Sequence, residues 1–376
     1  MRILINCSNL KQGGGVQVAD SICRFLHNIT EHSFVVVLSS YLDSTACAIK
    51  SNQNIKVIRY DVKNTLATLL FGRDATLDSI VKKYAIDAVL TVFGPSRWIP
   101  KCAHVCGFAR AQLLLMDSPY IRQLDKIGRF KATLLQIIWS HLFRKCSNVF
   151  HTENPMISKM LEQKFHGTKV YTVTNYYNQV FDEPENQIDF PLTDFDGLTL
   201  LTISTPYPHK NMKITLEVAR LLKEQHPNFR FRFVLTAKEE NFDYDFKRDI
   251  YSISENIVLI GRVDVRNCPS LYRQSDICFQ PSLLECFTAT YCEAMRMGKP
   301  IVTTNLPFAR GLCGSAAFYY DATDAQSCAD AIYHLANNPS LQKNLIVSGK
   351  KQLDIFDNYE SRARKLIEIT ANQVNK

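Results

Sequence analysis

The chain has 376 residues, of which 46% are hydrophobic and 21% charged, so it can bury sizeable cores and is not a disordered polypeptide. At roughly 100–200 residues per domain, this length predicts two or three domains. The formal net charge of +8 is a mild excess of basic residues. It permits an anionic partner, and the absence of any known nucleic-acid-binding motif argues against nucleic acid.

The cysteines and the apolar runs of the sequence indicate in which cellular compartment the protein is expected. The 12 cysteines are scattered, and no two form a C-x-x-C pair, so we expect free thiols in a reducing cytoplasm and no structural zinc. The N-terminal apolar stretch is too short for a signal peptide. The longest uncharged apolar run, 132–143, is shorter than the about 20 residues of a spanning helix. We expect a cytoplasmic protein, with peripheral attachment to the inner face of the cytoplasmic membrane as an open possibility.

Short apolar, β-branched runs alternate with helical spacing along the first half of the chain. Strands are predicted over 2–6, 34–38, 56–60, 88–93, 105–108, 149–152 and 170–174. Helices are predicted over 16–26, 77–84 and 124–143. Continuous apolar strands that alternate with helices are typical of parallel sheets covered on both faces.

This alternation breaks at 177–197, which is polar, acidic and proline-bearing and is therefore predicted to be a linker. It then restarts, with predicted strands at 198–204, 230–235, 257–260, 277–279 and 300–304 and helices at 213–223 and 290–297. We predict an α/β protein with two domains, 1–176 and 198–356. A C-terminal helix within 357–376 could cross back to the N-terminal domain.

The most specific signal is the segment 281–302, PSLLECFTATYCEAMRMGKPIV, in which a strand runs into a loop, a helix and a second strand. Glu285 falls in the loop and Glu293 about one turn inside the helix. Backbone N–H groups at the start of that helix would favour an anion. Glu285 could then accept hydrogen bonds from hydroxyls of a ligand whose phosphates rest on the helix end. A capping carboxylate at 285 and a surface glutamate at 293 are the alternative.

The whole phrase resembles the E-x7-E region of retaining glycosyltransferases of sequence-based family 4, which have two Rossmann-like domains facing across a cleft (the GT-B type). The residues in register with the family phrase are Pro281, Ser282, Glu285, Phe287, Glu293, Ala294, Met295, Gly298, Pro300 and Val302. The glycine loop at 13–15 and the segment ISTPYPHKN at 203–211 resemble the family's opening and its basic phosphate-binding motif. The resemblance extends over nearly the whole chain and is strongest over 198–322.

This resemblance implies a site for a nucleotide-diphosphate sugar. Glu293 would hold the ribose hydroxyls and Glu285 the hydroxyls of the donor sugar. The amides of Cys286, Phe287 and Thr288 would meet the distal phosphate and sugar. Lys210 would neutralise the diphosphate as the glycosidic bond breaks. For Lys210 the alternative is a solvated lysine at a helix start, which would oppose the helix dipole unless an anion is bound.

Three further residues complete the donor side. Arg262, after Gly261, could assist Lys210 or flank the base. Gly14 and Gly15 would approach the donor phosphates or the acceptor, because glycine allows close backbone approach. The triplet is not a complete G-x-G-x-x-G fingerprint, since position 18 is Val18, and a plain turn is equally compatible with it.

The chain departs from the family at several positions. Thr205 stands where an arginine is usual, and Thr288 where a glycine is usual. A histidine often faces the reaction centre from the N-terminal domain, but His104 enters its strand rather than leaving it and is expected to be packed. Arg110, just past the end of that strand, is the better candidate for the acceptor side.

Two D-x-D sequences, 194–196 and 243–245, could indicate a metal-dependent transferase. Both lie in polar connections, where solvated acidic loops are the common case. We therefore expect no catalytic metal and no cofactor, with the nucleotide sugar acting as a substrate.

Residues 119–145 carry six basic side chains beside an apolar set at helical spacing that includes Phe130, Leu134, Ile137 and Ile138. Such a helix can lie in an anionic membrane interface. The same apolar stripe could instead pack on the N-terminal sheet. Both possibilities are open from the sequence.

The resemblance implies a retaining, metal-independent glycosyltransferase that uses a saccharide or lipid-linked saccharide acceptor, with a role in surface polysaccharide or lipopolysaccharide biosynthesis. Front-face attack with the donor phosphate as base would need no protein nucleophile. The alternatives are a non-catalytic nucleotide-sugar-binding partner, for which Thr205 and Thr288 argue, and another enzyme of the same fold, such as a nucleotide-sugar epimerase.

Overall fold

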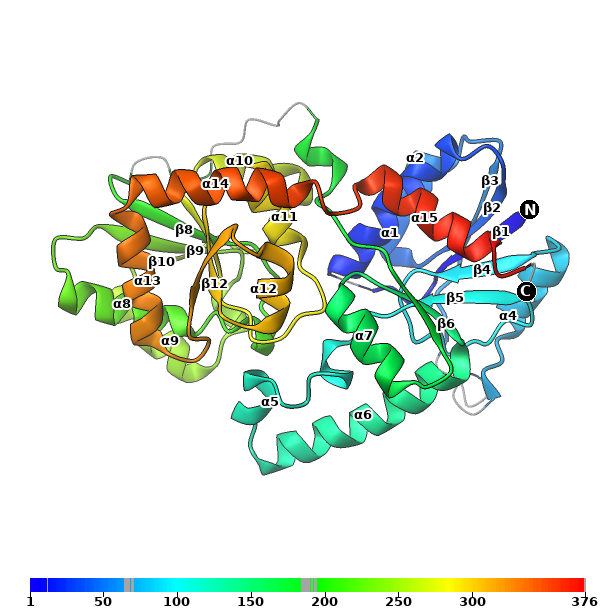
Figure 1. Cartoon of the computed structure of the whole chain (residues 1–376), viewed down its shortest axis with the longest axis horizontal. Helices are drawn as coiled ribbons and strands as arrows, with labels where there is room; N and C mark the ends of the chain where they lie inside the picture. The colour runs from blue at the N-terminus through cyan, green and yellow to red at the C-terminus, as the bar shows by residue number, and fades with distance from the viewer. Residues whose placement is uncertain are drawn as a thin grey trace. The chain divides into compact units, whose positions relative to one another are not determined.

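The computed structural model describes residues 1–11, 13–63, 68, 71–183, 190, 192 and 195–374. The chain folds into two compact units (Figure 1). Unit 1 comprises residues 1–116, 124–176 and 357–376, and unit 2 comprises residues 117–123 and 177–356. The C-terminal segment therefore folds with the N-terminal sheet. Residues 117–123 group with unit 2, whereas the predicted N-terminal domain contained them.

Unit 1 is built on seven parallel strands in the order β3-β2-β1-β4-β5-β6-β7. Their bounds are β1 (Arg2–Cys7), β2 (Ser33–Leu38), β3 (Ile55–Arg59), β4 (Ala88–Thr91), β5 (Ala103–Gly107), β6 (Val149–Thr152) and β7 (Lys169–Thr172). Alternate residues of a strand point to opposite faces of this sheet, and each face has its own hydrophobic core. Ile3 and Ile5 of β1 face one core, and Leu4 faces the other.

Helices cover both faces of the unit 1 sheet. They are α1 (Gly14–Phe25), α2 (Asp43–Ile49), α4 (Ala75–Lys83), α6 (Lys126–Cys146), α7 (Pro155–Lys164) and α15 (Tyr359–Ala371). The C-terminal helix α15 lies beside α1, as Figure 1 shows, and its Leu366 and Ile367 share a core with Ile22 of α1. Arg362 of α15 donates hydrogen bonds to Asn175 and to Ser21 (2.8 Å). These contacts fix the end of the chain on unit 1.

Unit 2 has six parallel strands in the order β10-β9-β8-β11-β12-β13. They are β8 (Leu198–Thr202), β9 (Phe231–Leu235), β10 (Ile257–Leu259), β11 (Ile277–Gln280), β12 (Ile301–Thr304) and β13 (Ala317–Tyr320). Every strand but β13 is predicted from the sequence. With its covering helices, this arrangement confirms the predicted α/β fold of two doubly wound sheets.

The helices of unit 2 include the short α5 of the inserted segment. They are α5 (Pro119–Gln123), α8 (Ile214–Gln225), α9 (Tyr244–Ile250), α10 (Cys268–Arg273), α11 (Ala289–Arg296), α12 (Pro307–Cys313), α13 (Ala325–Ala336) and α14 (Pro339–Leu353). Helices α11 and α14 pack closely at Gly349, where a Cβ atom would lie 3.1 Å from Cγ of Met295. A side chain at 349 would therefore push α14 away from the helix that carries Glu293.

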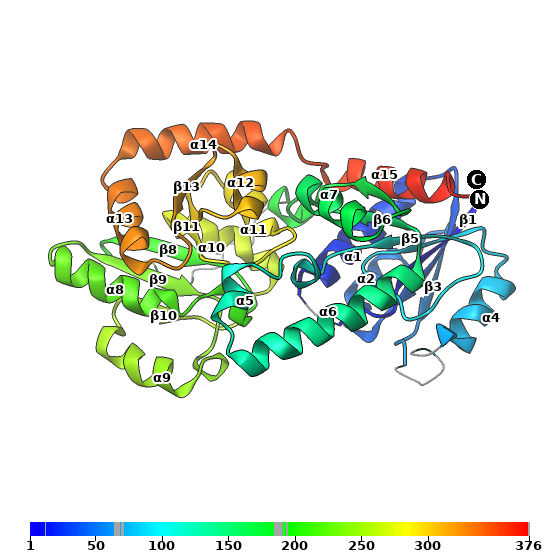
Figure 2. The same cartoon turned by 60° about the horizontal axis from the view of Figure 1, so that its bottom comes forward.

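The basic stretch 119–145 is not one helix. The chain breaks between α5 and α6, where Asp125 caps α6 by accepting a hydrogen bond from the backbone N–H of Gly128 (2.7 Å). Figure 2 shows α6 as a single long helix. Only Phe143 and Cys146 of α6 are buried, both at its C-terminal end.

Most of the apolar stripe of α6 does not pack on the sheet. Five of its members are 45–69% exposed, namely Ile127, Phe130, Leu134, Ile137 and Ile138. The last member, Phe143, is buried and meets Phe150 of β6 with ring centroids 6.1 Å apart. The face that turns toward unit 1 carries Gln136, which donates to the carbonyl of Leu113 (3.0 Å), and the buried Phe143. Packing of the stripe on the sheet, one of the two predicted possibilities, is therefore confirmed for Phe143 and wrong for the five exposed members. No helix in the described part of the chain is long and apolar enough to cross a bilayer.

Candidate functional site

The strand order of unit 2 reverses direction between β8 and β11, which are neighbours in the sheet. In doubly wound sheets, ligands bind at the carboxyl ends of the strands at such a switch point. The loops that leave these two strands meet here. The backbone N–H of Leu283 donates to the carbonyl of His209 (2.8 Å), and the hydroxyl of Thr290 donates to the carbonyl of Ile203 (3.3 Å).

Lys210 and Glu285, which were predicted from separate motifs, form an ion pair across these two loops. The Nζ atom of Lys210 donates a hydrogen bond to Oε1 of Glu285. The side chains are 13% and 9% exposed, so both charges are largely withdrawn from water. Each charge then depends on the other for compensation. The pair contradicts the solvated lysine that was the alternative for Lys210.

Aromatic rings hold the loop that carries Lys210. The ring of Tyr207 stacks on that of His209 with centroids 5.6 Å apart, and Tyr120 of α5 meets His209 edge-on at 5.9 Å. Asn211 closes the turn with a φ of 51°. Burial lowers the pKa of His209, an effect that the charge of Glu285 opposes and that of Lys210 reinforces. His209 and Tyr120 were not predicted, because no spacing rule links position 120 to position 209.

Helix α11 begins four residues after Glu285. Thr288 occupies the N-cap position, and its hydroxyl donates to the hydroxyl of Thr290 (3.2 Å) rather than accepting from a backbone N–H. Glu285 is therefore not the capping carboxylate that was the alternative for this position. Cys286 is buried, and the partly buried ring of Phe287 meets Phe356 edge-on at 5.7 Å.

Glu293 lies in the middle of α11 and is partly buried. The hydroxyl of the fully buried Tyr272 donates to its Oε2 atom (3.1 Å). Burial raises the pKa of Glu293 to about 7, and the hydrogen bond from Tyr272 partly opposes this rise. This environment contradicts the surface glutamate that was the alternative for 293. Tyr272, on α10, was not predicted because it lies outside the E-x7-E phrase.

Arg262 does not join this cluster in the described residues. It is exposed and follows Gly261 at the carboxyl end of β10, the edge strand, which is separated from β8 by β9. Its charge acts on Asp264, whose pKa is lowered mainly by a hydrogen bond from Arg266 and less by Arg262.

The candidate residues of unit 1 lie at the carboxyl ends of β1 and β5. Gly14 opens α1, and a Cβ atom there would meet nothing within 4 Å, whereas one on Gly15 would touch Phe93 at 3.4 Å. Arg110 is exposed, and its guanidinium lies 4.4 Å from the ring centroid of Trp139. Gly14 thus borders open space, while Arg110 rests on an aromatic face.

His104 is packed, as expected. One ring nitrogen contacts the hydroxyl of Thr91 (2.9 Å), and the other contacts the carbonyl of Cys146 (2.8 Å). Burial lowers its pKa to about 4, so the ring is neutral near pH 7.

The D-x-D aspartates have structural partners where they are described. Asp243 caps α9 through the N–H of Phe246 (3.2 Å) and pairs with Lys213, and Asp245 pairs with Arg248 (3.3 Å). Asp196 pairs with Arg230 (3.0 Å), whereas Asp194 lies outside the described residues. Within the described ranges no three His, Cys, Asp or Glu side chains gather as metal ligands would.

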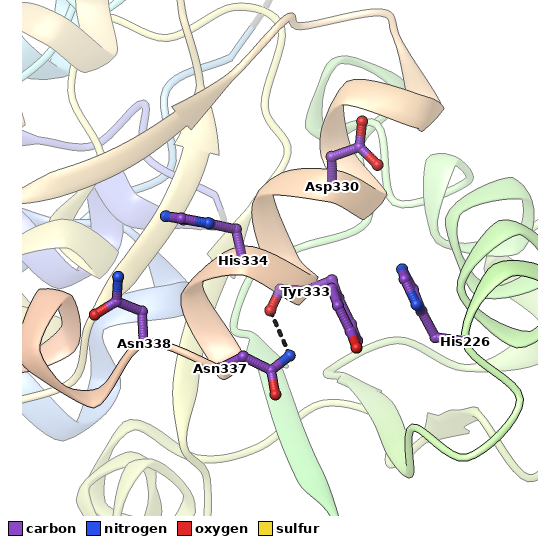
Figure 3. A pocket seen from close by; sticks show the side chains of 6 residues that line it. All are labelled: His226, Asp330, Tyr333, His334, Asn337 and Asn338. Atoms are coloured by element: carbon purple, nitrogen blue, oxygen red, sulfur yellow. Dashed lines mark hydrogen bonds between the residues drawn. The ribbon is translucent and has the colours of Figure 1, made fainter.

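A separate surface hollow of about 370 Å³ lies at the C-terminal ends of α8 and α13 (Figure 3). Its lining residues are His226, Asp330, Tyr333, His334, Asn337 and Asn338. The rings of His226 and Tyr333 stack on each other with centroids 3.4 Å apart. Because α8 and α13 run back from the carboxyl ends of their strands, this hollow lies at the opposite edge of the sheet from Lys210 and Glu285.

The two doubly wound units have the GT-B fold. The glycosyltransferase from Rickettsia africae ESF-5 is similar over 100% of this chain and 98% of its own, with a TM-score of 0.74 and 16% identity. Anabaena Alr3699/HepE in complex with UDP and glucose is similar over 98% of this chain and 99% of its own, with a TM-score of 0.69 and 13% identity. A putative UDP-N-acetylglucosamine 2-epimerase from Listeria monocytogenes is similar over 100% of this chain and 97% of its own, with a TM-score of 0.64 and 12% identity. These likenesses establish the fold.

Sequence comparison matches part of the chain. Residues 185–352 match the family described as "Glycosyl transferases group 1". A segment of 111 residues, 30% of this chain, is 25% identical to the phosphatidylinositol N-acetylglucosaminyltransferase gpi3 subunit of Schizosaccharomyces pombe. The matched segment spans 24% of that relative's length. The family match thus includes both loops of the Lys210–Glu285 pair and the whole of α11.

Proposed function

We propose that this protein is a retaining glycosyltransferase that moves a sugar from a nucleotide-diphosphate sugar to a saccharide or lipid-linked saccharide acceptor. The observation that carries the proposal is the meeting of Lys210 and Glu285 at the β8–β11 switch point, with Glu293 about one turn inside α11. A cation beside a helix N-terminus suits a diphosphate, and two separate carboxylates suit two sets of hydroxyls.

Each group has a distinct role in this proposal. Lys210 and the N–H groups of Phe287 and Thr288 would take the diphosphate, whose charge grows as the glycosidic bond breaks. Glu285 would accept hydrogen bonds from the donor sugar, and Glu293 would hold the ribose. Arg262, at the end of the edge strand, would serve the base side rather than the diphosphate.

Unit 1 would hold the acceptor, with Arg110 just past the end of β5, and its Gly14 and Gly15 would approach the donor phosphates or the acceptor. We propose front-face attack with retention, in which the donor phosphate takes the proton of the attacking hydroxyl. No protein nucleophile and no metal are required in this scheme. The described D-x-D aspartates cap a helix or pair with basic side chains, which supports metal independence.

A panel of nucleotide sugars tests the donor proposal. One or more of them should raise the melting temperature and bind in calorimetry, because a ligand specific for the native state stabilises it. Replacing Glu293 with alanine should weaken that binding by about 1.5–3 kcal/mol for each lost charge-assisted hydrogen bond. Unchanged affinity in this variant would show that Glu293 does not bind the donor.

We propose further that α6 attaches the protein to an anionic lipid surface, where lipid-linked acceptors of surface polysaccharide biosynthesis reside. The exposed stripe of α6 is bordered by Lys126, Arg129 and Lys131, with Lys145 at its far end. An exposed apolar face of this size with basic neighbours is typical of helices that lie in a membrane interface. Each basic residue near the surface would contribute on the order of 1 kcal/mol.

Vesicle co-sedimentation tests this attachment. Wild-type protein should bind phosphatidylglycerol vesicles at low salt and lose binding as salt shortens the Debye length below about 8 Å. Phe130→Asp, at a position 69% exposed, should abolish binding without unfolding the protein. Tyr41→Asp, at an exposed position outside α6, is the matched control and should bind normally. Wild-type protein that ignores these vesicles would contradict the proposal.

The two alternatives predict different products from the same donor. A non-catalytic partner would bind a nucleotide sugar and leave it intact. An epimerase would change the configuration of the sugar ring or release an epimerised sugar without passing it to an acceptor hydroxyl. Since an epimerase and glycosyltransferases share this fold, only the fate of the donor separates these functions.

A further inference from the structure

We propose that the Lys210–Glu285 ion pair discriminates the intact nucleotide sugar from the nucleoside diphosphate that remains after transfer. The inference rests on the proposed function and adds to it a selectivity between substrate and product. It follows from one contact: the group expected to hold phosphate and the group expected to hold sugar hydroxyls bind each other in the ligand-free protein.

In the ligand-free state the two side chains substitute for the donor. The Glu285 carboxylate stands where a phosphate oxygen would meet Lys210, and the Lys210 ammonium stands where hydroxyls would meet Glu285. With only 13% and 9% of the side chains exposed, water compensates little of either charge. Removing one partner therefore leaves a charge that is poorly solvated, which is more costly than exchanging the pair for new partners.

The intact donor exchanges both partners at once. Its diphosphate oxygens accept from Lys210, and the hydroxyls of its sugar donate to Glu285. A nucleoside diphosphate offers only the first of these exchanges. It would leave Glu285 without a donor and bring a second anion close to that carboxylate, which like-charge repulsion also opposes.

The protein holds the two loops together, so the penalty cannot be avoided by moving them apart. The Leu283–His209 backbone hydrogen bond joins the two loops next to the pair. The ring of His209 is held between Tyr207 and Tyr120. Burial lowers the pKa of His209, which disfavours a charged imidazole as a replacement for Lys210 beside Glu285.

The consequence concerns product release. Once the sugar has left, Glu285 has lost its donors, and re-formation of the ion pair competes with the nucleoside diphosphate for Lys210. The pair would thus lower the affinity for product without lowering that for donor. Specificity of this kind is a difference between two affinities, here created by a buried group left unpaired.

Calorimetry on the full chain tests the inference with UDP and UDP-glucose, or with whichever nucleotide sugar binds tightest and its diphosphate. Wild-type protein should bind the nucleotide sugar at least about tenfold tighter than the diphosphate. Glu285→Gln removes the competing anion, so the affinity for the diphosphate should rise about tenfold while that for the nucleotide sugar falls or stays unchanged. Glu293→Gln is the matched control and should weaken both ligands by the same factor.

A wild-type measurement covers the case in which Glu285→Gln fails to fold. A free monosaccharide of the donor type should increase the affinity for the diphosphate, because its hydroxyls give Glu285 new hydrogen-bond donors. An affinity for the diphosphate that equals that for the nucleotide sugar and ignores added monosaccharide would overturn the inference. So would a folded Glu285→Gln protein with unchanged relative affinities.

These outcomes are distinct from failure of the proposed function. If wild-type protein binds neither nucleoside diphosphates nor any nucleotide sugar, the proposed donor site is wrong, and the discrimination fails with it. If both ligands bind but removal of the Glu285 charge leaves their ratio unchanged, the donor site stands and only the discrimination is rejected.

Discussion

At the scale of single residues, the candidate site is a set of charges placed where water compensates them poorly. Lys210 and Glu285 compensate each other, whereas Glu293 relies on the hydroxyl of Tyr272. Burial raises the pKa of Glu293 to about 7 from a usual value of 4.5. Perturbed carboxyl groups of this kind are enriched at functional sites, since a fold optimised for stability alone would avoid them.

Lys210→Ala should lower kcat about 100-fold and raise the donor KM less. The reason is that the charge on the diphosphate grows toward the transition state, so the ammonium stabilises that state more than bound donor. Steady-state kinetics on a competent donor measures both constants. Lys213→Ala, which removes a nearby exposed lysine paired with Asp243, is the control. A change confined to KM would show that Lys210 only binds.

Glu293→Gln should make the protein more stable at high pH. The folded-state pKa of Glu293 is raised, so its contribution to stability is fully present below about pH 4.5 and is lost as the pH rises through about 7. A shift of this size corresponds to about 3 kcal/mol. Urea unfolding at about pH 5 and about pH 8 should therefore show a smaller pH dependence for the variant than for wild type. Equal losses of stability in the two proteins would contradict the assignment.

At the scale of elements, how far the sequence predicts the structure depends on what sets each feature. Continuous apolar runs predict β1, β2 and β6 well, because central parallel strands are buried on both faces. β13 was missed because its sequence, AFYY, contains none of the β-branched residues that mark the other strands. The helical spacing of apolar residues predicted α6, but it could not show whether the apolar face packs on the sheet or is exposed. Periodicity locates an apolar face on a helix and does not identify what that face contacts.

The residues of the candidate site also fall into those that the sequence predicts and those that it does not. Glu285, Glu293 and Lys210 are identified from local phrases because the chemistry of each loop is local. Tyr272 and His209 were not predicted as site residues, because their roles follow from contacts between segments far apart in the chain. The ion pair itself follows from the strand order, which places β8 beside β11 and brings two distant loops together.

Asp243→Ala should lower the stability of α9 and leave the transferase activity unchanged. It removes the N-cap of α9 and the partner of Lys213, so the variant should unfold at a lower temperature than wild type. Transferase activity should persist in this variant, and in wild-type protein treated with EDTA. Thermal unfolding and an activity assay test the two statements separately. Loss of activity on chelation, restored by magnesium or manganese, would show that the proposed metal independence is wrong.

At the scale of the whole molecule, each unit carries its own core, and the chain passes between them more than once. Segment 117–123 leaves unit 1 to join unit 2, and the last 20 residues return to unit 1. Lys210, Arg262, Glu285 and Glu293 belong to unit 2. Gly14, Gly15, Arg110 and the exposed face of α6 belong to unit 1. We therefore propose that donor binding and acceptor or lipid binding are properties of different units, separable by mutation.

The proposed reaction is the transfer of a sugar from a nucleotide-diphosphate sugar with retention of configuration. The most direct test is a proton and phosphorus NMR time course of a bound nucleotide sugar with a saccharide acceptor. We expect that nucleoside diphosphate and a new glycoside appear together, that the anomeric configuration of the donor is kept, and that Lys210→Ala slows both signals equally. A donor that stays intact, or whose sugar changes configuration without transfer to the acceptor, would contradict it.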